Sequence, residues 1–234
     1  MTLLLATRNA HKVEEIRAIP GNQFQFFTLN DFPGAPPVVE DADTFAGNAI
    51  KKAIEVVKWL AVNPGSRSAI GDSRFFVLAD DSGLEVDALK GAPGVHSARF
   101  AAMDSAKSGN TTDADNNAKL LRLLKEAPAE KRTARFRCVL ALMPVEHREP
   151  GVESRSPVCY ANEFETRVEL FEGVCEGKII FEPRGQNGFG FDPLFVPDGF
   201  DKTFAELSEG VKNKSSHRAR ALEKLRIHLS KTLI

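Results

Sequence analysis

Hydrophobic and polar positions alternate along this chain with two different periods, one typical of strands and one typical of helices. Short apolar runs bounded by polar residues indicate buried strands. Patterns in which every second residue is apolar indicate strands with one face on a core. The strands predicted on this basis cover residues 2–6, 24–29, 75–79, 84–86, 134–142 and 164–170.

Apolar residues also recur three and four positions apart in four segments, which is the spacing of a helix with one buried face. The predicted helices begin near Lys12, Thr44, Asp113 and Ser215. Asp43 or Thr44 can cap the second helix, which ends at Asn63-Pro64-Gly65. Because strands and helices are mixed and no internal repeat is present, we expect residues 1–234 to form a single α/β domain.

Composition and charge narrow the classes of function. Hydrophobic residues make up 42% of the chain and charged residues 27%, so the chain can bury a substantial core. The formal net charge of -1 provides no general field for nucleic acid or for an anionic membrane surface. Any anion that this protein binds must therefore be held by a local cluster of residues.

The cysteines and the N-terminus predict a cytoplasmic protein. Cys138, Cys159 and Cys175 are far apart and form no C-x-x-C pair, which is typical of a reduced compartment. The apolar run at 3–6 follows no basic segment and is too short for a signal peptide. No window approaches the length of a membrane span, so no membrane partner is expected.

Four polar clusters lie at the ends of apolar elements, where loops can present side chains to a ligand. The first consists of Thr7, Arg8, Asn9, Ala10, His11 and Lys12, between a predicted strand and a predicted helix. Its hydroxyl, amide, cation and free backbone N–H groups suit phosphate oxygens. A helix cap with solvated charges is the alternative interpretation.

The second cluster is acidic. Asp80 and Asp81 follow an apolar strand with no basic residue beside them, and Glu40 belongs to a separate acidic patch before a helix. Adjacent carboxylates repel more strongly as the local dielectric falls, so a bound cation would stabilise them. Mg²⁺ needs few protein carboxylates and often bridges phosphates. Asp80 and Asp81 therefore favour a magnesium site over a simple Asp-Ser-Gly turn, whereas Glu40 alone does not.

The third cluster is the sequence GFGFDP from Gly188. Its glycines allow close approach of a flat ligand to the backbone, and Phe189 and Phe191 can stack on that ligand. The carboxylate of Asp192 can accept hydrogen bonds from the edge of a base. The alternative is a glycine-rich turn with core phenylalanines.

The fourth cluster is the segment 212–218 at the expected start of the last helix, which carries the basic residues Lys212, Lys214, His217 and Arg218. Positive charges there oppose the helix dipole at about 0.3–1 kcal/mol each, and a bound polyanion would remove this penalty. A solvated basic face is the alternative. Neither a Walker A loop nor a Rossmann glycine pattern is present.

Taken together, the clusters suit a nucleoside polyphosphate: a cation held by carboxylates, two basic phosphate contacts and an aromatic slot with a polar edge. The reaction that they favour is hydrolysis of a phosphoanhydride, with a carboxylate activating water.

At these residues the chain resembles the inosine triphosphate pyrophosphatase family, also called Ham1-like or RdgB-like. Six blocks carry the resemblance, in this order: LATRNAHK from Leu5, EDADTFAGNA from Glu40, LADDSGLEVDAL from Leu78, GAPGVHSARF from Gly91, GFGFDP from Gly188 and TFAELSEGVKNKSSHRARAL from Thr203.

The resemblance implies an α/β fold with a long central mixed sheet, helices on its faces, two lobes with a deep cleft between them, and a homodimer. It also implies Mg²⁺-dependent conversion of noncanonical purine triphosphates (ITP, dITP and XTP) to the monophosphate and pyrophosphate, which cleanses the nucleotide pool.

Roles for individual residues follow from the resemblance by position. Glu40 and Asp81 would serve the metal, and Asp81 would also accept the proton of the attacking water. The residues expected to bind substrate are Thr7, Arg8, Asn9, Ala10, His11, Lys12, Ser82, Phe189, Gly190, Phe191, Asp192, Lys212, His217 and Arg218.

Two other hypotheses compete with this one. A Maf-like nucleotide pyrophosphatase would share the carboxylates at a strand end but prefer other bases. A nucleotide-binding module without activity would lack catalytic carboxylates, yet Asp80 and Asp81 are both present. Binding of nucleic acid is disfavoured because aromatic and basic residues do not alternate along any predicted strand.

Overall fold

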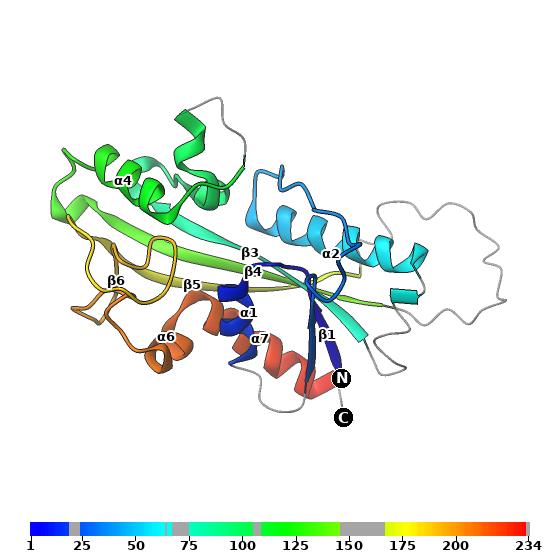
Figure 1. Ribbon diagram of the computed structural model, residues 1–234. Helices are drawn as coiled ribbons and strands as arrows, with labels where there is room; N and C mark the ends of the chain where they lie inside the picture. The colour runs from blue at the N-terminus through cyan, green and yellow to red at the C-terminus, as the bar shows by residue number, and fades with distance from the viewer. Residues whose placement is uncertain (19–23, 64, 67–74, 105–108, 146–166, 233–234) are drawn as a thin grey trace. The chain divides into compact units, whose positions relative to one another are not determined.

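The computed structural model describes residues 1–18, 24–63, 65–66, 75–104, 109–145 and 167–232. Its six strands form one mixed sheet in the order β2-β1-β3-β4-β5-β6, accompanied by helices (Figure 1). The strands are β1 (Thr2–Leu5), β2 (Gln25–Thr28), β3 (Phe75–Val86), β4 (Thr133–Pro144), β5 (Glu169–Ile179) and β6 (Phe195–Pro197). The α-helices with bounds inside the described residues are α1 (Ala10–Arg17), α2 (Phe45–Val62), α4 (Asp113–Leu123), α6 (Glu209–Ser215) and α7 (His217–Thr232). The predicted α/β class with a central mixed sheet is confirmed.

The chain divides into two compact units. Met1–Asp81 and Val139–Phe171 make up the first, and Ser82–Cys138 and Glu172–Ile234 make up the second. The expectations of a single domain and of a deep cleft stay predictions. No helix in the described part of the chain is long and apolar enough to cross a membrane.

In the first unit, β1 lies between β2 and β3 and is parallel to both. All four residues of β1 are buried, as expected for the continuous apolar run of a strand inside a parallel sheet. The helix α2 begins where Thr44 caps it by accepting a hydrogen bond from the N–H of Gly47. Its buried face includes Ala49, Ala53 and Leu60. The predicted cap and apolar face of this helix are therefore confirmed.

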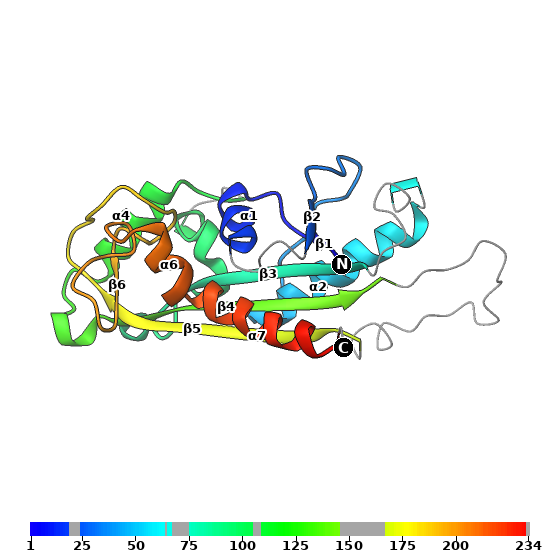
Figure 2. The ribbon, with the colours of Figure 1, turned by 90° about the horizontal axis from the view of Figure 1, so that it is seen from below.

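In the second unit, the core gathers aromatic rings from distant parts of the chain. Phe136 of β4 lies edge-on to Phe195 of β6, with ring centroids 4.8 Å apart, and Phe204 packs against both. The helix α7 runs along β5 (Figure 2). The backbones of these two elements approach closely at Gly173, where an added Cβ would lie 2.0 Å from the carbonyl oxygen of His217. Glycine at this position therefore sets the distance between β5 and α7.

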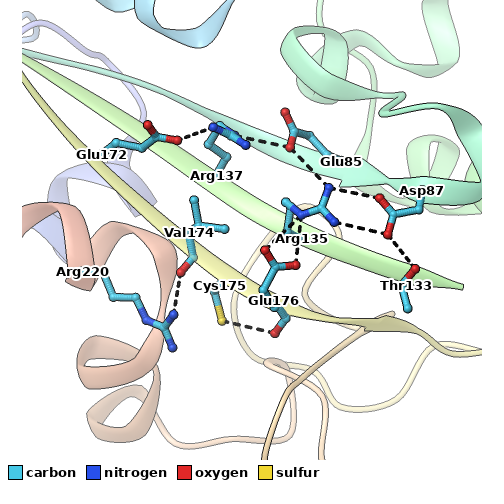
Figure 3. Close-up of polar contacts among 10 residues, drawn as sticks. All are labelled: Glu85, Asp87, Thr133, Arg135, Arg137, Glu172, Val174, Cys175, Glu176 and Arg220. Atoms are coloured by element: carbon cyan, nitrogen blue, oxygen red, sulfur yellow. Dashed lines mark hydrogen bonds and ion pairs between the residues drawn. The ribbon is translucent and has the colours of Figure 1, made fainter.

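One face of the sheet in the second unit carries a ladder of ion pairs (Figure 3). Arg135 of β4 bonds to Glu176 of β5 and to Asp87, and Arg137 bonds to Glu85 and Glu172. Opposite charges on neighbouring strands stabilise strand pairing. The alternation in the first half of β4 thus places apolar residues on the core face and charged residues on the other, as predicted. From Cys138 on, the opposite face is buried as well, at Val139, Ala141 and Met143, so the predicted single buried face does not extend over the whole strand.

Two predicted element boundaries are wrong. Strand β3 runs without interruption from Phe75 to Val86, although two strands and a turn were expected there. Strand β5 begins at Glu169, so the strand predicted from residue 164 starts too early; residues 164–166 themselves lie outside the described residues. The last helix, expected from about Ser215, is confirmed as α7; it begins at His217, because Ser216 has extended backbone angles and its hydroxyl caps α7 by accepting from the N–H of Ala219. The short helix α6, which ends at Ser215, was not predicted.

Candidate functional site

The two adjacent aspartates of β3 are buried, with 3% of Asp80 and 4% of Asp81 exposed. Consecutive residues of a strand point to opposite faces, so the two carboxylates do not face each other. Asp80 pairs with the ammonium group of Lys12 from α1, and Asp81 pairs with Lys52 from α2 at 3.1 Å. Each charge therefore has its own cation, which is why the strand continues through this acidic pair.

Lys52 is the centre of the acidic site, which we define as Glu40, Asp80, Asp81 and Lys52. Its Nζ lies 2.9 Å from Oε1 of Glu40 and 3.1 Å from Oδ1 of Asp81. It also donates to the backbone carbonyl of Asp80 at 3.0 Å. The other carboxylate oxygen of Asp81 accepts from the side-chain amide of Asn48 at 3.1 Å. Glu40 and Asp81, which are 41 positions apart in the sequence, thus meet at one ammonium group.

The electrostatics of the acidic site follow from this geometry. Burial raises the pKa of Asp81 above its ordinary value, although the charges of Lys52 and Lys12 act in the opposite direction. Burial on its own would lower the pKa of Lys52, but the negative charges of Asp81 and Glu40 outweigh it and raise that pKa. The carboxylate of Asp81 is therefore more basic than an ordinary aspartate and lies beside a firmly charged ammonium group.

The acidic site fits a magnesium ion by the chemistry of its donors. Carboxylate oxygens are ligands that Mg²⁺ prefers, and this ion usually keeps several waters and adds oxygens from a substrate phosphate. In this structure the point where Glu40 and Asp81 meet is the ammonium group of Lys52. Among the described residues, no group of three or more His, Cys, Asp or Glu side chains could hold a metal ion. A metal site made of protein ligands alone is thus not seen in that part of the chain. Glu40 and Asp81 are compatible with a site whose remaining ligands are oxygens of a substrate.

The first predicted cluster forms the turn between β1 and α1. The side chain of Asn9 caps α1 by accepting from the N–H of Lys12 at 3.2 Å, and Thr7 accepts from the N–H of Asn9. Arg8 donates to the carbonyl of Ala35. Ala10 and His11 are exposed at the start of the helix. The helix-cap interpretation therefore holds for Asn9, while Lys12 reaches the acidic site through its pair with Asp80.

The aromatic loop, residues 188–192 of the second unit, uses its two phenylalanines differently. Phe191 is 3% exposed and packs edge-on against Phe100 in the core, so the core interpretation applies to this ring and stacking on a ligand does not. Phe189 is half-buried. Asp192 accepts from the N–H of Phe189 and from the ammonium group of Lys212. Its carboxylate thus holds the loop and a cation together.

Two of the predicted basic residues, Lys212 and Arg218, lie at this loop, and a third, His217, packs in the core of the same unit. The Nζ of Lys212 lies 4.9 Å from the centroid of the Phe189 ring, and the Cζ of Arg218 lies 5.9 Å from it. Arg218 also donates to the hydroxyl of Ser82 at 2.8 Å. His217 stacks on Phe136, with centroids 4.9 Å apart. The second unit therefore brings together most of the residues that were predicted to bind a base.

The expected charge penalty at the start of the last helix is partly wrong. Lys212 and Lys214 lie in the last turn of α6, where positive charge stabilises the helix dipole. Only His217 and Arg218 lie at the start of α7. The division of the segment into two helices reverses the sign of the dipole effect for the lysines.

Lys52 and Asn48 were missed by the sequence analysis, although a signal for both exists. Two polar residues, Asn48 and Lys52, occupy positions in the otherwise apolar buried stripe of α2. The members of this stripe recur at helical spacing and include Phe45, Asn48, Ala49, Lys52, Ala53, Val56, Val57 and Leu60. A lysine on the buried face of a helix requires a buried partner of opposite charge. That requirement points to Asp81.

Comparisons with known proteins extend over nearly the whole chain. The model described as the Ham1 family matches residues 3–228. A protein of Desulforamulus reducens named dITP/XTP pyrophosphatase is 44% identical over 225 residues, covering 96% of this chain and 93% of that protein.

Solved structures are similar as well. A HAM1 protein from Coxiella burnetii has a TM-score of 0.75 and 35% identity, covering 99% of both chains. A nucleoside-triphosphatase / dITP/XTP pyrophosphatase from Mycobacterium abscessus has a TM-score of 0.64 and 35% identity, covering 96% of this chain and 98% of that one. The resemblance carried by the six sequence blocks is thereby confirmed.

Proposed function

This chain belongs to the Ham1 family, and from that premise we propose that it hydrolyses noncanonical purine nucleoside triphosphates to the monophosphate and pyrophosphate. The observation that carries the proposal is the acidic site, in which buried Asp81 and Glu40 meet at Lys52. A buried cluster of carboxylates and lysines is costly for stability, and its desolvated charges suit chemistry on a phosphate.

In the proposed reaction, Asp81 is the general base. It accepts a proton from a water molecule, whose oxygen attacks one phosphorus of the α–β anhydride. The anhydride bond breaks, and its electrons stay with the departing phosphate oxygen. A raised pKa makes Asp81 a better proton acceptor while its pair with Lys52 keeps it ionised.

The lysines and the second unit supply binding. Lys12 and Lys52 balance the negative charge of the phosphates. Asn9 caps α1, and the N-terminus of this helix favours negative charge nearby. Phe189 offers its ring to the base, and Lys212 and Arg218 flank that ring. Glu40 and Asp81 are the side chains that would hold a divalent cation. Mg²⁺ bound there would neutralise the charge that develops on the phosphate oxygens.

The proposal is tested with a panel of triphosphates, scored by product. We expect ITP, dITP and XTP to be turned over faster than the four ordinary triphosphates, with release of pyrophosphate and a requirement for Mg²⁺. Release of orthophosphate, or preference for pyrimidine substrates, would favour a Maf-like or other activity instead. Asp81→Asn should lower turnover by a factor of about 10² or more. Binding without turnover by the unaltered chain would identify a nucleotide-binding module.

A homodimer and a cytoplasmic location complete the proposal. The homodimer comes from the resemblance to the family, and the location comes from the reduced cysteines predicted by the sequence. Sedimentation equilibrium of the full chain tests the dimer, and fractionation of cells tests the location.

A further inference from the structure

Two side chains of α4 hold the backbone of the aromatic loop at a single residue. The N–H of Gly190 donates to Oδ2 of Asp113 at 2.6 Å, and the carbonyl of Gly190 accepts from Nδ2 of Asn117 at 3.0 Å. Asp113 and Asn117 are four residues apart in α4, so they lie on the same face of the helix. Both backbone polar groups of Gly190 are thus fixed by one helix.

The orientation of Asn117 is determined by this contact. Its Oδ1 is buried and has no hydrogen-bond partner within the described part of the chain. Rotating the amide by half a turn would place Oδ1 against the carbonyl oxygen of Gly190, and two acceptors would then face each other. A buried acceptor without a partner reduces stability. The fold therefore leaves Oδ1 of Asn117 without a partner and keeps its Nδ2 as the donor to the carbonyl of Gly190.

The residues on either side of Gly190 show what the contact controls. Phe191 is fixed in the core against Phe100, and Asp192 is fixed by Lys212. Phe189, on the other side, is the half-buried ring that Lys212 and Arg218 flank. Because Gly190 has a positive φ of 64° and no side chain of its own, its conformation depends on its backbone partners. The two α4 side chains thereby set the direction in which the chain leaves the core toward Phe189.

We propose that Asp113 and Asn117 are positioning residues for base selectivity: they hold Gly190 so that the ring of Phe189 is presented to the base in one orientation. This inference rests on the proposed function. Neither side chain is expected to touch the phosphates or the reacting atoms. Their loss should therefore affect binding and choice of base more than the chemical step.

The test compares Asp113→Ala, Asp113→Asn and Asn117→Ala with the unaltered enzyme, using ITP and ATP as substrates. Losing one such hydrogen bond should raise KM for ITP about fivefold with kcat within about twofold, and reduce the preference for ITP over ATP by a similar factor. Asp113→Asn should retain the preference, because the asparagine oxygen can still accept from Gly190. Hydrogen exchange at the N–H of Gly190 should accelerate most in Asp113→Ala, which removes its acceptor, and less in Asn117→Ala, which loosens only the carbonyl of the same residue.

Asp115→Ala is the matched control. Asp115 carries the same charge in the same first turn of α4, but its carboxylate bonds to Thr112 and not to the aromatic loop. We expect it to leave the ratio of ITP to ATP turnover unchanged. A positioning role is excluded if the two alanine variants keep the preference of the unaltered enzyme, or if Asp115→Ala reduces it equally.

Failure of the proposed function has a different signature. In that case the unaltered chain would not prefer ITP, before any variant is compared. Exchange at Gly190 would still report whether α4 holds the loop, and unchanged exchange in both alanine variants would overturn the inference on structural grounds.

Discussion

Replacing Lys52 with methionine tests the acidic site through stability alone, without reference to activity. Methionine has a similar length and no charge. The substitution removes the partner that Asp81 and Glu40 share, together with the hydrogen bond to the carbonyl of Asp80. In the folded state Asp81 would then keep only the amide of Asn48 among the side-chain partners described above.

The magnitude follows from burial. Removing one partner of a buried ion pair costs about 3–5 kcal/mol, because the other charge is left buried and unpaired. The side chain of Glu40 is 35% exposed and can be solvated, whereas that of Asp81 is 6% exposed and cannot. With one stranded charge, we expect Lys52→Met to lower the free energy of unfolding by about 3 kcal/mol.

The pH for the measurement follows from the direction of the pKa shift. The pKa of Lys52 is raised in the folded state, so its contribution to stability is fully present below its unfolded pKa. The contribution declines only as the pH rises through that value, about 10.4, and beyond it. Urea unfolding at pH 7 in the presence of a chelator therefore measures the whole effect.

Lys51→Met provides the control. Lys51 is the preceding residue of α2, and it pairs with exposed Asp41. Its loss should leave stability unchanged within error. The double variant with Asp81→Asn should recover most of the loss caused by Lys52→Met, because both buried charges are then absent. If Lys52→Met were as stable as Lys51→Met, the buried pairing would not exist in solution and the argument for the acidic site would fail.

Three further predictions concern the second unit. Gly173→Ala should lower thermal stability by roughly 1–3 kcal/mol, since its Cβ would meet the backbone of α7 at His217; Gly210→Ala, with open space around it, should not. Arg132→Met should lower the free energy of unfolding in urea by about 3 kcal/mol. The described hydrogen bonds of this buried side chain all go to backbone carbonyls, and these carbonyls would lose their donor. Burial raises the pKa of Cys175 to about 11, so its thiol should not react with Ellman's reagent at pH 8 until the protein unfolds; rapid modification of the native thiol would contradict its burial.

Features that depend on short-range periodicity were predictable. The strand β4 has a two-residue period over Ala134, Phe136 and Cys138, and these side chains are buried as expected. The cap at Thr44 was predictable too, because the hydroxyl and the N–H of Gly47 that it binds are three residues apart. The clustering of polar residues also pointed to Asp81, Lys12 and the aromatic loop, although Asp81 lies inside β3 and not at the end of an element as expected. The roles of these residues in binding and catalysis stay predictions.

The partners of those residues were not predictable from local pattern. Aspartate and glycine disfavour strands, so β3 was predicted as two short strands, 75–79 and 84–86, separated by the acidic segment. It stays extended because Lys12 and Lys52 arrive from two helices and compensate its charges. Likewise Phe189 and Phe191 are the same residue type, and each follows a glycine in the sequence GFGFDP. Only Phe191 is buried in the core.

The amino-acid sequence of this chain thus specifies most of its helices and strands and many of their buried faces. It also specifies the residue types that suit an enzyme acting on phosphate groups. The pairing of polar side chains depends on contacts between residues far apart in the sequence. Lys52 and Asp81 are separated by 29 positions, Lys212 and Asp192 by 20, and Arg218 and Ser82 by 136. Burying a charge is unfavourable unless its partner is brought to it, and only packing of the whole chain brings these partners together. That is why a helix lysine with an ordinary local sequence becomes the centre of the acidic site.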